Sequence, residues 1–448
     1  VEILRGISDS WLLAYLFFLV HAIRLSNYHD TPLTRFLVER AIQRPNFIGH
    51  YLFWFLVSEM HEKSVAERYG LLMDTFLRAC GEAQRISLIS QLQCANQLER
   101  IANLVRGAPP ARRRQLLHDE LVDFEFPSEF QNPVNPTVYA SSIRVDKCRV
   151  MDSFTAPLWL HFQNSDPTST DPVRLLFKVG DDLRQDSLVV YTFRVIDRVW
   201  KKHGLDLRLS LYECLPTGDC AGFIEVVPKA EALATIQKTH AGGGIIGAMA
   251  AFSKSPLLAW LRANNTSGLP FSQVVENFMF SCAGFVVISY VLGLGDRHND
   301  NIMIRKSGHL FHIDFAHFLG NMMQWKGIKR ETAPFVLTKE FVHVMGGEKS
   351  EMFKSFADLC CTAFGILRKY YRLLISLFVM MIGAGLPQLR SLADVEHLKT
   401  TLAVDLSDAE ADTNFRKLIR QSLKSKTTKM NFAIHNLAQV AKNPGESK

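Results

Sequence analysis

The sequence predicts an α+β fold in which an all-helical region is followed by a small β-rich lobe and then a large helical lobe. Apolar residues recur at helical spacing over residues 11–105, short β-rich segments follow from Thr137, and helical spacing returns after Pro228. The chain has 448 residues, whereas one domain usually has roughly 100 to 200. Two or three folded units are therefore expected.

Residues 1–108 are predicted to form a helical domain of short antiparallel helices. Turn signals divide its helical pattern at 28–30, 44–46 and 81–82. The chain begins within helical sequence, as a fragment would. Residues 109–136 carry several prolines and the basic run Arg112, Arg113 and Arg114, and they are predicted to form a linker.

The small lobe is predicted to span residues 137–228 and the large lobe residues 229–448. Strands are expected in the small lobe at 145–151, 158–162, 175–179, 209–214 and 222–227, with one helix at 185–203. In the large lobe, long helices are expected at 271–292, 351–383 and 408–441, with short strands at 301–304 and 311–314. A β-rich small lobe followed by a helical large lobe is typical of kinases.

The composition is that of a folded globular protein and excludes a largely disordered chain. A hydrophobic content of 48% and a charged content of 21% indicate a folded chain. The excess of 51 basic over 44 acidic residues suits an anionic substrate or an acidic membrane surface. The run 112–114 alone would suit nucleic acid, and such a run is usually a solvated connector, so no nucleic-acid partner is expected.

The cysteine pattern and the apolar runs favour a cytoplasmic protein. None of the eight cysteines has zinc-knuckle spacing, and we expect reduced thiols. The apolar runs at 11–20 and 373–385 are shorter than the roughly 18 residues of a membrane span. No signal peptide is recognised at the start of the sequence.

Two polar clusters flank the pair of short strands in the large lobe. Residues 295–301 precede the first strand, and Asp314 ends the second. A turn at Ser307 and Gly308 would make the two strands a hairpin, which would bring Asn301 and Asp314 to one end. Each polar residue alone is more simply a solvated turn residue. Together, an amide oxygen and a carboxylate predict a Mg²⁺ site for phosphoryl transfer.

The segments Asp-Arg-His-x-x-Asn at 296–301 and His-Ile-Asp-Phe at 312–315 resemble the catalytic and metal-binding loops of phosphoinositide 3-kinases. The likeness extends to 48–56, 177–186 and 334–338, so it covers essentially the whole chain. It implies a helical accessory domain followed by a two-lobed, protein-kinase-like lipid kinase domain. It also implies ATP and Mg²⁺ as cofactors, and transfer of the ATP γ-phosphate to the 3-hydroxyl of the inositol ring of phosphatidylinositol lipids.

The resemblance also implies a role for individual residues. His298 would be the general base, with Asp296 as the competing candidate, and Lys178 would be the cation on the nucleotide phosphates. Asn301 and Asp314 would hold the metal. The ATP site would be formed by Ser153, Trp159, Lys178, Asp186, Tyr212, Glu225, Val227, Met303 and Ile313. The inositol headgroup would meet Lys326, Lys329 and Arg330.

Three departures from the family concern anion binding and loop geometry. The phosphate loop has Phe154, Thr155 and Ala156 where the commonest class carries lysines. An early basic pair of the activation loop is replaced by Met323 and Trp325. Because charge-assisted hydrogen bonds contribute roughly 1.5 to 3 kcal/mol each, a less phosphorylated headgroup is expected.

The third departure is Ala316, which stands where the family has glycine. Alanine would be strained there if the position needs a positive φ, and fits without strain if φ is ordinary. Strain at this position would favour a slowed or inactive enzyme.

The class within the family and two rival functions stay open. Residues 214–219 and 341–345 resemble class I catalytic subunits, whereas 431–439 resemble class II. The rivals are a protein kinase of the related large-kinase family and a catalytically weakened pseudokinase scaffold. Expected partners are a phosphoinositide lipid at a membrane surface, to which the chain is recruited peripherally, and a regulatory or adaptor subunit bound through regions before Val1.

Overall fold

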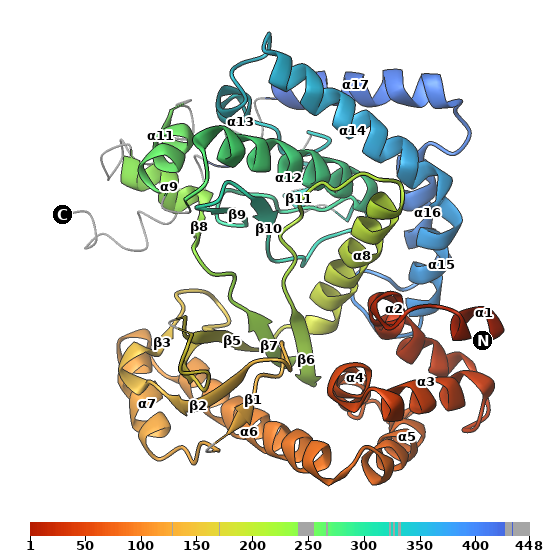
Figure 1. Ribbon diagram of the computed structural model, residues 1–448, viewed down its shortest axis with the longest axis vertical. Coiled ribbons are helices and arrows are strands. Elements are labelled where there is room, and N and C mark those ends of the chain that lie inside the picture. Colours follow the sequence, from red (N-terminus) through yellow and green to blue (C-terminus); the bar gives the residue numbers. More distant parts are fainter. Residues whose placement is uncertain are drawn as a thin grey trace. The chain divides into compact units, whose positions relative to one another are not determined.

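The computed structural model describes residues 1–127, 129–169, 171–240, 255–265, 268–321, 324–325, 328–329, 333–425 and Phe432. The chain forms two compact units. Unit 1 comprises Val1–Thr192 and Tyr212–Val226, and unit 2 comprises Phe193–Leu211 and Val227–Lys448. The chain therefore passes from one unit to the other three times, and helix α8 (Leu183–Lys202) contributes to both (Figure 1).

The first part of unit 1 is helical. Its α-helices are α1 (Glu2–Arg5), α2 (Asp9–Ala22), α3 (Pro32–Gln43), α4 (His50–Val57), α5 (Ala66–Ala79), α6 (Glu82–Gly107) and α7 (Pro110–Val122), with a 3₁₀ turn at Ile23–Leu25 and a π turn at Pro45–Gly49. Thr31 forms a capping box at the start of α3, where Pro32 needs no hydrogen-bond acceptor. A Cβ at Gly49 would lie 2.4 Å from the Phe76 ring, so glycine permits the close packing of α5.

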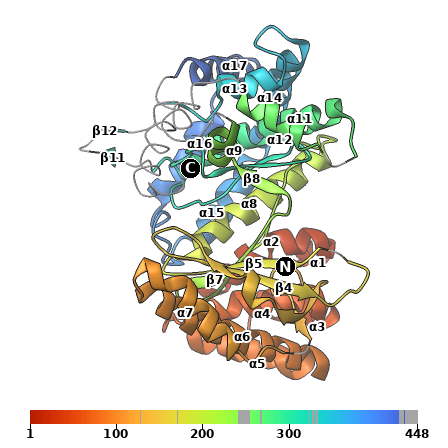
Figure 2. The ribbon, with the colours of Figure 1, turned by 90° about the vertical axis from the view of Figure 1, so that its left-hand side faces the viewer.

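The second part of unit 1 is an antiparallel sheet. Its strands are β1 (Phe130–Gln131), β2 (Tyr139–Ile143), β3 (Arg149–Val150), β4 (Leu158–Asn164), β5 (Val173–Val179), β6 (Cys214–Gly218) and β7 (Ala221–Glu225), with a 3₁₀ turn at Val145–Lys147. Their order is β1-β2-β4-β5-β7-β6, and β3 pairs with β4. Helix α6 packs against β5 and lies below one face of the sheet (Figures 1 and 2).

Unit 2 is mainly helical. It contains β8 (Ala230–Ala232), α9 (Leu233–His240), α11 (Pro256–Ala263), α12 (Phe271–Leu292), β9 (Ile302–Arg305), β10 (Leu310–His312), β11 (Gln324–Trp325), β12 (Ile328–Lys329), α13 (Lys339–Val344), α14 (Glu351–Lys369), α15 (Tyr371–Met381), α16 (Leu392–Leu402) and α17 (Asp408–Lys424). Among the described residues, α12 alone is long and apolar enough to cross a membrane, and 83% of its most apolar window is buried in the fold. Burial of this kind is that of a core helix.

The predicted fold class is confirmed, and the helix at 271–292 has the predicted bounds. Several local predictions are wrong. The predicted strand at 209–214 begins only at Cys214, and the predicted helix at 351–383 ends at Lys369 and restarts at Tyr371. Residues 109–136, predicted as a linker, contain α7. All eight cysteines are free.

His50 provides a test of the packing in unit 1. Its ring is fully buried, and Nε2 donates to the carbonyl oxygen of Pro133 at 2.8 Å. Burial lowers the pKa of His50 from 6.5 to about 4, although that hydrogen bond opposes the shift.

We expect the stabilisation from neutral His50 to be complete above pH 6.5 and to be lost as the pH falls toward 4. In this window the unfolded chain takes up a proton that the folded chain excludes, which costs about 3 kcal/mol in total. Thermal denaturation between about pH 7 and pH 4 should therefore be less pH-dependent in His50→Gln than in the wild type. Exposed His29→Gln is the control, and an unchanged pH dependence in His50→Gln would contradict the prediction.

Candidate active site

The hairpin of β9 and β10 brings the two predicted metal ligands to one end. His312 lies opposite Ile302, and the next residue along, Ile313, donates its N–H to the carbonyl oxygen of Asn301 at 3.1 Å. Gly308 closes the turn with φ +95°, and a Cβ there would lie 2.0 Å from the carbonyl oxygen of Val274. Only glycine fits this turn, so the hairpin follows directly from the sequence.

Arg297 joins the loop before β9 to the segment after β10. Its Nε donates to the carbonyl oxygen of Gly295 at 2.8 Å, and Nη1 donates to that of Ile313 at 2.7 Å. Its Nη2 donates to the carbonyl oxygen of Asp314. The side chain is buried, with the residue 4% exposed. Sequence reasoning gave Arg297 no role, although a buried arginine in a polar loop signals such a contact.

Arg297 stabilises an unusual backbone at the predicted metal ligand. Asp314 has φ +62° and Asp296 has φ +55°, and both values lie in the left-handed region that side chains other than glycine rarely adopt. The hydrogen bond to the carbonyl oxygen of Asp314 holds that backbone in place. Ala316 is not among the described residues with positive φ, so the strain considered for this alanine does not arise.

The side chains of Asn301 and Asp314 have the atoms that Mg²⁺ prefers. Nδ2 of Asn301 donates to the carbonyl oxygen of Asp296 at 3.1 Å, which leaves the amide oxygen as an acceptor. Asp314 is exposed and forms no ion pair with another described residue. No group of three or more His, Cys, Asp or Glu suited to a metal occurs in the described part of the chain. The two residues therefore fit an ion that takes its other ligands from phosphate and water.

His298 and Asp296 lie side by side in the loop before β9. His298 Nε2 is 3.9 Å from Asp296 Oδ2, and the two side chains are 18% and 35% exposed. The Asp300 N–H donates to His298 Nδ1 at 3.3 Å, a long hydrogen bond. In the neutral ring this arrangement puts the hydrogen on Nε2, facing the Asp296 carboxylate. The ring nitrogen and the carboxylate therefore face one another at a partly exposed position, at a separation too long for a direct hydrogen bond.

Lys178 is the penultimate residue of β5 in unit 1. Its Nζ is 2.6 Å from Asp181 Oδ2, and the side chain is only 15% exposed. Asp186 follows in the first turn of α8. Opposite Lys178 in β7 is Gly222, where a Cβ would lie 2.3 Å from the carbonyl oxygen of Leu215.

The remaining predicted ATP-site residues are divided between the two units. Ser153 is exposed in the loop between β3 and β4, and the guanidinium of Arg149 lies 4.5 Å from the Trp159 ring centroid. Glu225 Oε2 accepts the N–H of Glu213 at 2.9 Å. In unit 1 the structure places Ser153, Trp159, Lys178, Asp186, Tyr212 and Glu225, and in unit 2 it places Val227, Met303, Ile313 and the two metal ligands.

The predicted headgroup residues follow β10. Lys326, Arg330 and Met323 lie outside the described residues, and Lys329 is described only as part of β12. Their assignment therefore stays a prediction.

A buried hydrogen-bond chain that sequence reasoning missed supports the loop before β9. Asn299 Nδ2 donates to Gln237 Oε1 at 2.8 Å, and Gln237 Nε2 donates to Glu340 Oε2 at 2.8 Å. The other carboxylate oxygen of Glu340 accepts the Leu257 N–H at 3.0 Å. These polar side chains are almost fully buried, with Asn299 0%, Gln237 1% and Glu340 3% exposed.

Glu340→Gln tests whether this buried hydrogen-bond chain orders the loop before β9. An amide has one acceptor oxygen, so it cannot accept from both Gln237 and the Leu257 N–H, and one buried donor loses its partner. We expect unit 2 to lose about 1 to 3 kcal/mol of stability in thermal or denaturant unfolding, and hydrogen exchange to rise at residues 296–301. Exposed Glu348→Gln is the matched control, and unchanged exchange at 296–301 would contradict the prediction.

Comparisons with known proteins place this geometry in a family. Residues 172–391 match the family described as phosphatidylinositol 3- and 4-kinase. Residues 1–88 match the accessory domain (PIK domain) of the phosphoinositide 3-kinase family. The first match contains the β9–β10 hairpin with its two polar loops, and the second contains helices α1 to α5.

Individual relatives are similar to almost the whole chain. Phosphatidylinositol 3-kinase 1 of Dictyostelium discoideum is 43% identical over 440 residues, 98% of this chain and 28% of that protein. Phosphatidylinositol 3-kinase 2 of the same organism is 43% identical over 439 residues, 98% of this chain and 23% of that protein. The human phosphatidylinositol 4-phosphate 3-kinase C2 domain-containing subunit beta is 39% identical over 446 residues, 98% of this chain and 27% of that protein.

The chain thus spans only about a quarter of the length of these curated relatives. The match to the accessory domain precedes the match to the kinase family along the chain, just as the first helices precede the sheet in the structure. The chain belongs to the phosphoinositide 3-kinase family, of which it contains the accessory domain and the kinase domain.

Proposed function

We propose that this chain transfers the γ-phosphate of ATP to the 3-hydroxyl of the inositol ring in phosphatidylinositol lipids. The observation that carries the proposal is the convergence of Asn301, Asp314 and the pair His298–Asp296 at one end of the β9–β10 hairpin. Relatives at 39 to 43% identity are named as 3-kinases of phosphatidylinositol or of its 4-phosphate, which supports the same reaction. In this proposal residues 1–108 form the accessory domain, 109–136 a linker, and 137–228 and 229–448 the two kinase lobes.

The protein's part in such a reaction is to position groups and to stabilise charge. Asn301 and Asp314 would hold Mg²⁺, which neutralises charge on the phosphates when bound. Lys178 would place a cation on the nucleotide phosphates, and Asp181, now its partner at 2.6 Å, would orient it. The nucleotide would further contact Ser153, Trp159, Asp186, Tyr212, Glu225, Val227, Met303 and Ile313.

Proton transfer is assigned to His298, with Asp296 as its partner. When the inositol hydroxyl attacks, its proton must be accepted by a nearby base. His298 accepts that proton at Nε2 once its ring hydrogen moves to Nδ1, which requires that the long contact with the Asp300 N–H breaks. Asp296, 3.9 Å away, then stabilises the imidazolium.

The substrate lipid would be met at a membrane surface, to which the protein is recruited from the cytoplasm. Lys326, Lys329 and Arg330 are proposed to contact the inositol headgroup. A regulatory or adaptor subunit is proposed to bind through regions outside this chain.

His298→Ala tests the assignment of the base. We expect the turnover rate to fall by roughly 10²- to 10⁴-fold while binding of MgATP is retained, because the variant leaves both proposed metal ligands, Asn301 and Asp314, in place. Turnover is measured with phosphatidylinositol vesicles, and binding with a fluorescent ATP analogue. Exposed His343→Ala on α13 is the control.

Near-normal turnover of His298→Ala would overturn this role. A larger loss in Asp296→Asn than in His298→Ala would make Asp296 the base instead.

The second test identifies the acceptor. Met323 and Trp325 stand where a basic pair would meet headgroup phosphates, and the human relative is named for phosphatidylinositol 4-phosphate. We therefore expect kcat/KM to be higher for phosphatidylinositol and its 4-phosphate than for the 4,5-bisphosphate, with product analysis showing phosphate at the 3-position.

Preference for the 4,5-bisphosphate would contradict the expected specificity. Transfer to peptide acceptors only, or no Mg²⁺-dependent turnover with any acceptor, would contradict the proposed function itself.

A further inference from the structure

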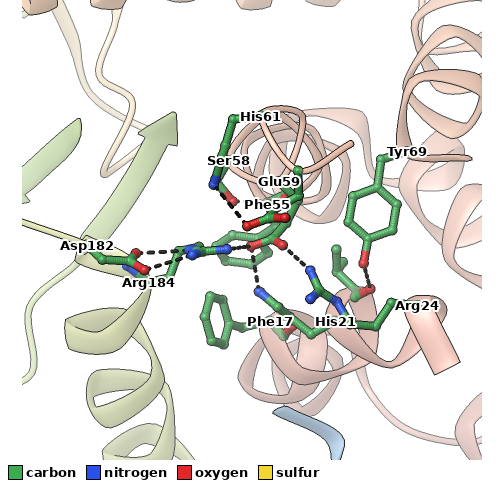
Figure 3. Close-up of polar contacts among 12 residues, drawn as sticks. Phe17, His21, Arg24, Phe55, Ser58, Glu59, His61, Tyr69, Asp182 and Arg184 are labelled. Carbon is green, nitrogen blue, oxygen red and sulfur yellow. Dashed lines mark hydrogen bonds and ion pairs between the residues drawn. The ribbon is translucent and has the colours of Figure 1, made fainter. Parts of the chain in front are cut away.

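A fully buried carboxylate lies in the helical part of unit 1, outside every site residue named above. Glu59 follows α4, and its side chain is 0% exposed. Three basic side chains converge on it (Figure 3): His21 Nε2 at 3.0 Å, Arg184 Nη1 at 3.0 Å, and Arg24 Nη2. Burial opposes ionisation of Glu59, yet its three basic neighbours hold its pKa below the usual value. The side chain is therefore an anion at neutral pH.

Arg184 differs from the other two partners because it belongs to the start of α8, 125 residues further along the chain. Its Nε donates to Asp182 Oδ1 at 2.9 Å and its Nη2 to Asp182 Oδ2 at 2.8 Å. This bidentate pair leaves Nη1 for Glu59. The Arg184 side chain is only 6% exposed, so one guanidinium connects the accessory helices to the first turn of α8.

Asp182 also holds the backbone at the start of α8. Its Oδ1 accepts the Arg184 N–H at 3.1 Å, and its carbonyl oxygen accepts the Gln185 N–H at 3.1 Å. A carboxylate in this position satisfies a backbone donor that the helix leaves unpaired. The side chain and the backbone N–H of Arg184 therefore depend on the same oxygen, Oδ1 of Asp182.

The segment fixed in this way contains residues proposed to bind the nucleotide. Asp181, which pairs with Lys178 at 2.6 Å, directly precedes Asp182, and Asp186 lies in the first turn of α8. A shift at Asp182 would move the partner of Lys178 as well as Asp186.

We propose that Glu59 is a positioning residue for nucleotide binding. Through Arg184 and Asp182 it holds the segment 178–186 in the arrangement that receives the ATP phosphates. The proposal rests on the proposed function. A purely stabilising role is a poorer account of this cluster, because the desolvation of buried ion pairs offsets much of their attraction.

Two variants and one control test the proposal. Glu59→Gln removes the charge and keeps the shape, and Arg184→Lys keeps the charge but cannot reach Glu59 and both oxygens of Asp182 together. Arg24→Gln is the matched control, because Arg24 pairs with the same carboxylate from the turn at Ile23–Leu25.

Amide hydrogen exchange at residues 181–187 and separate KM values for ATP and lipid are measured on the full chain. We expect exchange to rise in Glu59→Gln and Arg184→Lys, and KM for ATP to rise about 5- to 10-fold, with KM for lipid unchanged within about twofold. Arg24→Gln should lower the thermal midpoint and leave exchange at 181–187 and KM for ATP near wild-type values.

Unchanged exchange at 181–187 in both variants would overturn the proposal, and so would an equal rise of both KM values. Because exchange needs no turnover, it decides the role of Glu59 even if the wild type transfers no phosphate. A wild type that transfers no phosphate would overturn the proposed function but not the role of Glu59.

Discussion

The arrangement of the candidate active site depends on the guanidinium of Arg297. A single planar group donates hydrogen bonds to carbonyl oxygens of Gly295, Ile313 and Asp314, which lie on two separate loops. The rigid fork of arginine can satisfy three such acceptors, whereas the ammonium of lysine is a compact point charge. The left-handed backbone of Asp314 persists because this group and the hairpin fix the chain on both sides.

The same principle recurs in both units of the molecule. Loops that carry polar chemistry are held by buried polar side chains from distant parts of the sequence, namely Arg184 with Glu59 in unit 1 and Asn299 with Gln237 and Glu340 in unit 2. Apolar packing alone fixes the position of a helix but leaves a loop free to choose among conformations. A buried hydrogen-bond chain selects one of them.

Regular elements could be predicted from the sequence because their signals are local. The apolar residues of α12 give a continuous pattern that ends at the left-handed Gly293, and Gly308 marks the turn of the hairpin. Helix α7 was missed because Pro109 and Pro110 resemble a break, although Pro110 occupies the first turn of the helix, where proline is favoured.

The supporting contacts could not be predicted, since their partners are far apart in the sequence. Glu340 lies 103 residues from Gln237, and neither residue has a recognisable pattern around it. Glu59 did leave a signal, because a single acidic residue after the apolar run of α4 is seldom buried without a partner. The identity of that partner, Arg184, required the structure.

The interleaving of the two units affects how the chain can fold during synthesis. The sheet of unit 1 lacks β6 and β7 until Val226 has been made, although the second half of α8, which belongs to unit 2, is made before them. Domains usually fold as units in the order in which they leave the ribosome. Here the first unit cannot be completed until part of the second has already been synthesised. Strand β5 therefore lacks its partner β7 on the nascent chain during this interval. A fragment that starts at Thr137 would meet a related difficulty, because it keeps Arg184 but lacks the helices that carry Glu59.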